Sequence, residues 1–322
     1  MASHGQHNSA HLGPRYGGRI PALAWVDGAV TTSINAVDPE TVLTEAVGAY
    51  RAALGDRLVA AYALGSLAHG GFSPLVSDID LGLIVGDPPR SGDAERIQSV
   101  ADAEKSKGAG LNERLSVFWG TRSTLRGERE GGRFPPLDRL DLIENGRLLA
   151  GTDARDGLPR PSADELVITG AEFALDFLAG VRRPGGPQAE GLGSMRPAGE
   201  ETVEEIRSPE ALLARGVRRL TKLVLFPVRF LYTAETGRVG TNDAAVAHYL
   251  ADNDAPGHTL VAAALAWRTS PPNDDNAAAE LLHEQMMPLY LHYIDDHIPR
   301  LDSLGQAQLA RAFEEWRDRL VR

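Results

Sequence analysis

The chain has 322 residues, a formal net charge of −11 and no cysteine. The missing cysteines exclude disulfides and thiolate metal ligands, no apolar run is long enough to span a bilayer and no secretory signal is visible, so we expect a cytoplasmic protein without a membrane partner. The acidic charge disfavours broad, non-specific binding to nucleic acid, and the length suits two domains.

The first elements lead from a tail into a strand. Residues 1–35 are rich in Gly, Ser, Asn and His without any period, and we expect a mobile tail there. A helix is predicted to begin at Asp38-Pro39, a capping residue followed by proline, and to run to about Leu54. An apolar strand over 58–64 comes next.

A motif that points to chemistry follows this strand: Gly65-Ser66, eleven further residues, then Asp78-Ile79-Asp80. Residues two apart on a strand face the same side, so Asp78 and Asp80 lie together while Ile79 faces apolar packing. Adjacent carboxylates repel each other unless a cation lies between them, and Mg²⁺ is commonly held by one or two carboxylates with substrate phosphates. The Gly-Ser turn offers N–H groups and a hydroxyl to a phosphate. An isolated Asp-x-Asp is more often a solvated strand end, but this one follows a strand and a Gly-Ser turn.

The remaining elements divide the chain into two parts. A polar helix over 91–107, a strand over 115–119 and a short helix between Pro135-Pro136 and Gly146 complete an α/β (α+β) domain over 36–152, a mixed sheet with flanking helices. An all-helical C-terminal domain is expected over 160–322, with a flexible loop at 182–207 that is rich in Gly, Pro and Glu. Its predicted helices cover 165–180, 209–235, 241–252, 257–268, 276–297 and 303–321.

The motif resembles the signature of the nucleotidyltransferase superfamily, whose fold is shared with DNA polymerase β. The matching residues are Leu64, Gly65, Ser66, Asp78, Ile79, Asp80 and Leu81. Residues 222–250, KLVLFPVRFLYTAETGRVGTNDAAVAHYL, are similar to the C-terminal helical domain of the streptomycin and spectinomycin adenylyltransferases. The resemblance implies Mg²⁺ or Mn²⁺ as cofactor, a nucleoside triphosphate co-substrate that we expect to be ATP, and transfer of a nucleoside monophosphate onto a hydroxyl of a small molecule.

The resemblance also implies roles for individual residues. Asp78 and Asp80 become catalytic metal ligands, and Gly65 and Ser66 become contacts to the triphosphate. Arg229 is implied to reach the triphosphate from the helical domain. A lysine that shares this work in the family falls here at Asn242, and we expect Arg238 or the basic cluster at 215–222 to compensate.

The third carboxylate of the family has no direct counterpart. Its position on the strand over 115–119 best matches Ser116, and serine is not an ordinary general base. We assign the role to Glu113, which requires a register difference of three residues, with Asp141 and Glu144 as weaker candidates. Three explanations stay open: another carboxylate takes the role, the acceptor needs no strong base, or catalysis has been lost.

The acceptor side also departs from the family. Arg215, Arg218, Arg219 and Lys222 lie near one face of a predicted helix, either as a solvated basic face or as part of the site. The family carries a Trp and acids for drug recognition ahead of this helix, whereas this chain reads SPEALLARGVRR. The best remaining acidic candidates are Glu172 and Asp176, four residues apart.

Two alternatives to a small-molecule acceptor stay open. The acceptor can be a tRNA or a protein, as in toxin-like members of the superfamily; the arginine-rich helix favours this and the net charge opposes it. The chain can also be a catalytically silent nucleotide-binding module, which Ser116 suggests.

Overall fold

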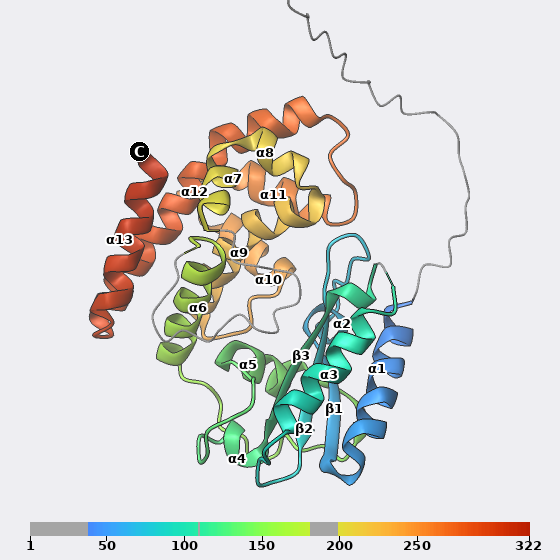
Figure 1. Cartoon of the computed structure of the whole chain (residues 1–322). Coiled ribbons are helices and arrows are strands. Elements are labelled where there is room, and N and C mark those ends of the chain that lie inside the picture. The colour runs from blue at the N-terminus through green and yellow to red at the C-terminus, as the bar shows by residue number, and fades with distance from the viewer. Residues whose placement is uncertain (1–37, 109, 181–198) are drawn as a thin grey trace, which may run out of the picture. The chain divides into compact units, whose positions relative to one another are not determined.

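A four-stranded mixed sheet lies in the N-terminal half of the chain (Figure 1). Its strands, in the spatial order β3-β2-β1-β4, are β1 (Leu58–Leu64), β2 (Ile79–Val85), β3 (Leu115–Thr121) and β4 (Arg147–Gly151). β1 pairs antiparallel with β2 and β4, and β2 pairs parallel with β3. The computed structural model describes residues 38–108, 110–180 and 199–322, so the expected N-terminal tail lies outside the described residues.

Helices flank both faces of this sheet. They are α1 (Pro39–Leu54), α2 (Gly65–His69), α3 (Asp93–Lys105), α4 (Arg122–Leu125) and α5 (Pro136–Asn145), with 3₁₀ turns η1 (Gly55–Arg57) and η2 (Asn112–Arg114). The predicted helix from Asp38-Pro39 to Leu54 is confirmed as α1, with Pro39 at its first position. The short helix that the two prolines and Gly146 predicted is confirmed as α5.

Alternation along β2 sorts its side chains onto the two faces of the sheet. Ile79, Leu81 and Leu83 are fully buried against α1 and α3 (Figure 1). Ile84 belongs to a second apolar cluster on the opposite face, which α5 joins. Because one face of β2 is apolar along its length, the register that buries Ile79 also directs Asp80 to the α5 face.

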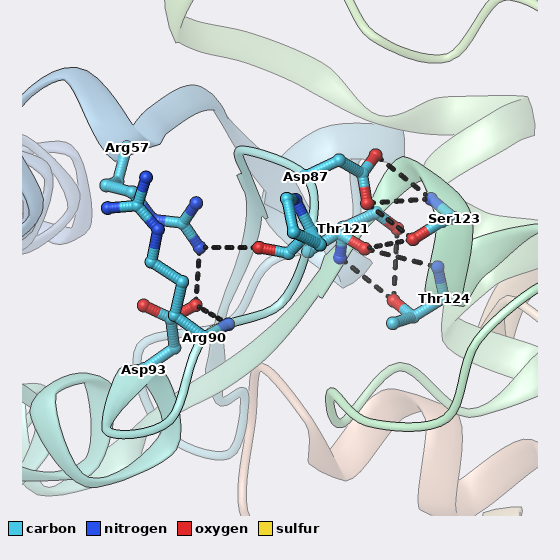
Figure 2. A network of polar contacts seen from close by, with 8 residues as sticks. Arg57, Asp87, Arg90, Asp93, Thr121, Ser123 and Thr124 are labelled. Atoms are coloured by element: carbon cyan, nitrogen blue, oxygen red, sulfur yellow. Dashed lines mark hydrogen bonds and ion pairs between the residues drawn. The ribbon is translucent and has the colours of Figure 1, made fainter.

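A network of polar contacts lies at the C-terminal end of β2, the end that is farther from Asp80 (Figure 2). The Asp87 carboxylate accepts hydrogen bonds from the backbone N–H of Ser123, at 3.2 Å, and from its hydroxyl. Nearby, Arg57 donates to the carboxylate of Asp93, the first residue of α3, at 2.5 Å. These bonds tie the chain after β2 to the turn η1 that precedes β1 and to the helix α4 that follows β3, and so hold β2 in its register.

The C-terminal half is helical, as predicted. Its elements are α6 (Ala163–Phe177), α7 (Gly199–Arg207), α8 (Pro209–Ala214), α9 (Val217–Thr236), α10 (Asn242–Ala251), α11 (His258–Trp267), α12 (Asp275–Ser303) and α13 (Ala307–Val321). The fold class, a mixed sheet with flanking helices followed by a helical region, is confirmed. Within the described ranges, no helix combines the length and the apolar character needed to cross a lipid bilayer.

Residues 37–322 form one compact unit. Within it the helical half has its own core, with Tyr290, Tyr293, Phe313 and Trp316 fully buried between α12 and α13. The sheet half has two smaller apolar clusters, one on each face. The division into domains at 152–160 stays a prediction.

Two predicted boundaries in the helical half are wrong. Residues 199–207, expected within a loop, form α7, because Val203 and Ile206 are buried three residues apart on one face of it. Residues 181–198 of that expected loop lie outside the described residues. The single helix expected over 209–235 is broken into α8 and α9 at Gly216, which has φ +85°.

Candidate functional site

β1 ends at Leu64 and Gly65 is the first residue of α2, so the predicted small-residue turn is a short helix. The φ of Gly65 is +59°, a backbone conformation that residues with a side chain rarely adopt, and a Cβ atom there would collide with the carboxylate of Asp80. The Gly65 N–H donates to Oδ2 of Asp141 at 2.6 Å. Both conformation and contact therefore require glycine at the point where β1 approaches Asp80.

Asp80 lies among further carboxylates on the α5 face. Burial raises its pKa to about 7, reinforced by repulsion from Asp78 and Asp141 and opposed by the positive charges of Lys222 and Arg229. Asp138 on α5 behaves in the same way: burial, followed by repulsion from Asp80 and Asp141, raises its pKa to about 8. Burial and mutual repulsion thus favour the neutral forms of Asp80 and Asp138.

Asp78, directly before β2, contacts α9 of the helical half. Arg218 donates to its Oδ1, and the Lys222 ammonium lies 2.5 Å from its Oδ2. Burial alone would raise the pKa of Asp78, but Lys222 and Arg218 outweigh it and hold the pKa below its usual value. The charge of Asp78 is therefore stabilised by two cations, whereas burial disfavours the charge of Asp80.

A cavity of about 260 Å³ collects these groups. Of the predicted site residues, the structure brings Gly65, Ser66, Asp78, Asp80 and Arg229 to its lining. Lys222 of the basic cluster also lines it, as do polar residues that the sequence analysis did not name, among them His69, Asp138, Thr241 and Arg268. The cavity thus joins the sheet half of the unit to its helical half.

The third-carboxylate assignment to Glu113 is not supported by its placement. The register of the parallel pair β2–β3 sets Ser116 beside Asp80, and Ser116 lines the cavity. Glu113 comes three residues earlier, in η2, where it is exposed and outside the cavity lining. Of the weaker candidates, Asp141 lines the cavity and Glu144 does not.

Arg229 and Arg238, both predicted to serve the nucleotide, are placed differently. Arg229 lines the cavity, its Nε donates to the carbonyl of Gly240 at 2.5 Å, and its guanidinium lies 5.6 Å from the Phe226 ring centroid. Desolvation lowers its pKa, against the pull of Asp80 and the α5 carboxylates. Arg238 is exposed beyond the C-terminus of α9 and is not part of the lining.

The basic residues at 215–222 divide into two pairs rather than forming one solvated face. Arg218 and Lys222 reach Asp78, as described. Arg215 and Arg219 instead pair with the buried carboxylate of Glu205 on α7, with shortest N–O distances of 3.0 and 2.7 Å. Glu172 and Asp176, the acidic candidates for acceptor recognition, are absent from the cavity lining.

Arg268, at the end of α11, holds the loop that leads to Asp78. It donates to the carbonyl of Gly71 at 2.6 Å and to the hydroxyl of Ser77 at 3.3 Å. In return, the hydroxyl of Ser73 donates to the Arg268 carbonyl. Asp78 is thus positioned by a buried residue of the helical half, which no local pattern in the sequence indicated.

An aromatic wall forms the apolar side of the cavity. Phe173 of α6 and Phe226 and Phe230 of α9 all line it, with ring centroids 5.7 to 6.1 Å apart. Such rings can stack on a planar base or pack against an apolar ligand surface.

Comparisons with known proteins assign no family. No protein-family model and no curated protein matches the sequence. Among solved structures, the chain is similar to a spectinomycin adenyltransferase, AAD(9), from Enterococcus faecialis, in a crystal structure with ATP and spectinomycin. The TM-score is 0.47 at 10% sequence identity, covering 77% of this chain and 99% of that chain. A similarity of this size assigns no function. The functional argument therefore rests on the residues of the site itself.

Proposed function

We propose that the chain is a metal-dependent nucleotidyltransferase that moves a nucleoside monophosphate, AMP from ATP, onto a hydroxyl of a small molecule. One observation carries the proposal: Asp78 and Asp80, the Gly65-Ser66 corner and the cations of α9 line the same cavity. Such a transfer requires carboxylates that hold a cation and positive charge that binds a polyphosphate. It also requires a backbone corner that a phosphate can approach closely.

The donor set fits Mg²⁺ or Mn²⁺. In the described part of the chain, no three His, Asp or Glu side chains are arranged to hold a metal by themselves. Two carboxylates completed by substrate phosphates suffice for Mg²⁺, and Asp78 and Asp80 would hold it. Burial and mutual repulsion raise the pKa values of Asp80 and Asp138 in spite of Lys222 and Arg229, and a divalent cation at Asp80 would offset this repulsion. A bound metal would stabilise the charge that develops at phosphorus and orient the attacking oxygen.

The chain's own residues supply the other functions. Arg229, half-buried beside the aromatic wall, would bind the polyphosphate, and Ser66 would donate its hydroxyl to a phosphate oxygen. Asp141 is engaged by the Gly65 N–H and by the Asn145 side chain. Asp138 therefore becomes the carboxylate that would accept the proton of the acceptor hydroxyl, in the role first assigned to Glu113.

A turnover assay tests this function. The chain is incubated with labelled ATP, GTP, CTP or UTP, Mg²⁺ or Mn²⁺ and a panel of hydroxyl-bearing metabolites and antibiotics, and pyrophosphate release is measured. We expect metal-dependent release with ATP and one class of acceptor, and none from Asp80→Asn. Equal release by wild type and Asp80→Asn would contradict the proposal.

A silent nucleotide-binding module is the second candidate, favoured by Ser116 beside Asp80. Calorimetry with Mg–ATP beside the turnover assay separates the two. Binding without release of pyrophosphate under any acceptor would favour the silent module.

Streptomycin and spectinomycin are expected to be poor substrates. Both are cationic, and Lys222 lines the cavity next to Asp78, with Arg218 on the same carboxylate, where acids would be needed to attract them. Adenylylation of each drug is measured by pyrophosphate release. A kcat/KM near the roughly 10⁴ M⁻¹s⁻¹ of an ordinary substrate would contradict this expectation.

Arg229→Ala is expected to weaken ATP binding about tenfold to a hundredfold, because a charge-assisted hydrogen bond contributes roughly 1.5–3 kcal/mol. Calorimetric titration with Mg–ATP measures the change, and Arg229→Lys, which keeps the charge, is the matched control. Since Arg229 also holds the Gly240 carbonyl, the melting temperature is recorded for each variant. A lowered melting temperature with unchanged ATP affinity would make Arg229 a purely structural residue.

A further inference from the structure

The contact of Arg218 and Lys222 with Asp78 has a consequence for the proposed metal site. The two cations lie four residues apart on α9, hence on one face of the helix. Arg218 takes Oδ1 of Asp78 and Lys222 takes Oδ2, so both carboxylate oxygens are engaged. The Lys222 and Asp78 side chains are 13% and 23% exposed, which places the contact away from bulk solvent.

A metal ion and these two cations compete for the same oxygens. Mg²⁺ binds carboxylate oxygen at about 2.0–2.1 Å and tolerates little distortion of its coordination. Asp78 therefore has to give up at least one of its cations before it can serve as a ligand. The displaced cation would then lose its hydrogen-bonded carboxylate in a poorly solvated place, which is costly unless another anion replaces Asp78.

The polyphosphate is the anion in the right place. A Mg²⁺ ion that binds a carboxylate and a phosphate holds both within about 2.1 Å, so their oxygens lie within about 4 Å of each other. A phosphate on the ion held by Asp78 would consequently lie close to Arg218 and Lys222, which contact the oxygens of the same carboxylate. Arg and Lys both bind phosphate well.

We infer that Arg218 and Lys222 are polyphosphate-binding residues that occupy Asp78 until a divalent cation takes it, and then transfer to the phosphates of the nucleotide. This inference rests on the proposed function and adds a second set of phosphate contacts beside Arg229. It predicts opposite effects on two affinities. Removing either cation frees Asp78 for the metal alone and weakens the nucleotide complex.

Two binding measurements on the full chain test it without reference to turnover. Mn²⁺ binding in the absence of nucleotide is followed by electron paramagnetic resonance, and binding of ATP and of inorganic tripolyphosphate at saturating Mg²⁺ is followed by calorimetry. For Lys222→Gln and Arg218→Gln we expect Mn²⁺ affinity to rise about tenfold and both polyphosphate affinities to fall about tenfold.

Two controls accompany the test. Arg215→Gln makes the same charge change three residues before Arg218, at the end of α8, but Arg215 pairs with Glu205 and the substitution should leave all three affinities unchanged. Lys222→Arg keeps the charge and should stay near wild type. Melting temperatures verify that each variant is folded, and if Lys222→Gln is not, Arg218→Gln carries the test, because Arg218 is the more exposed of the two cations at 32%.

The outcomes separate this inference from the proposed function. Mn²⁺ affinity that rises while ATP and tripolyphosphate affinities fall supports the transfer. A rise in Mn²⁺ affinity with unchanged ATP and tripolyphosphate affinities overturns it, because the cations then only mask Asp78. Unchanged affinities in both Lys222→Gln and Arg218→Gln overturn the inference, whereas the proposed nucleotidyl transfer can still hold. A wild-type chain that binds neither Mn²⁺ nor Mg–ATP overturns both.

Discussion

Asp80→Asn is expected to lower nucleotidyl transfer by several orders of magnitude and, at the same time, to make the metal-free protein more stable at pH 8. The rate falls because a metal ligand is lost, and metal stabilisation supplies several kcal/mol. Stability rises because a buried carboxylate that its neighbours repel becomes a neutral amide of the same shape. Pyrophosphate release and chemical denaturation measure the two effects.

The pH dependence gives the same prediction a sign. An Asp with an unfolded pKa of about 3.9 and a folded pKa of about 7 binds more protons in the folded state between these values. The free energy of unfolding therefore decreases as the pH rises from about 4 to about 7, and Asp138 extends this decrease to about pH 8. Asp80→Asn should flatten the decrease. An unchanged pH profile together with normal turnover would remove Asp80 from the site.

Asp78→Asn is the matched comparison, with the opposite effect on stability. It removes the anion that Arg218 and Lys222 share, and we expect a loss of about 1–3 kcal/mol in the free energy of unfolding. Transfer should be lost in this variant too. If both substitutions changed stability in the same direction, the charge arrangement described for the cavity would be contradicted.

Gly65→Ala is expected to lower kcat about a hundredfold, since displacing a reacting group by about 1 Å can cost that much. The new Cβ would meet the Asp80 carboxylate and push it from its place, in addition to the strain of a φ of +59°. Steady-state kinetics and Mn²⁺ affinity report the displacement.

Gly70→Ala separates collision from strain. Gly70 has φ +89°, but a Cβ there would meet no atom within 4 Å. Both variants should lose similar stability from the backbone, whereas only Gly65→Ala should lose activity. Comparable activity in the two variants would show that the approach of Gly65 to Asp80 has no role in the reaction.

Local patterns predicted the elements well where capping and apolar periodicity agree. Proline at the first position of α1 and α5 and the alternation of β2 fixed these elements and the direction of Ile79. The helix α7 was missed because it is short, rich in Glu and follows a segment rich in Gly and Pro, and only its packing against the rest of the helical half stabilises it.

The carboxylates of the site could be predicted only in part. Asp78 and Asp80 are neighbours in sequence, so the period of the strand suffices for them. Asp138 and Asp141 reach the same cavity from α5, and their spacing of three residues on a helix is a signal that could have suggested a shared face. Which sheet face α5 covers is a tertiary property that no local pattern determines.

The cations depended on tertiary contacts even more. The spacing of Arg215, Arg218, Arg219 and Lys222 gives a helix face but not its partner. The break at Gly216 and the position of Glu205 on α7 decide that two of them stabilise the helical half while the other two reach Asp78. Sequence spacing therefore identified the four basic residues as a cluster, whereas their division into two pairs depends on tertiary contacts.

The hydrogen bonds between Arg268 and the loop before Asp78 determine how this protein can be engineered. Gly71 and Ser77 accept hydrogen bonds from Arg268 at the end of α11, nearly 200 positions later in the chain, and Ser73 donates one to the Arg268 carbonyl. A chimaera that joins this sheet half to a foreign helical half would leave the loop without its anchor, even if both halves folded. To transplant the carboxylates into another protein, α11 has to be transplanted with them.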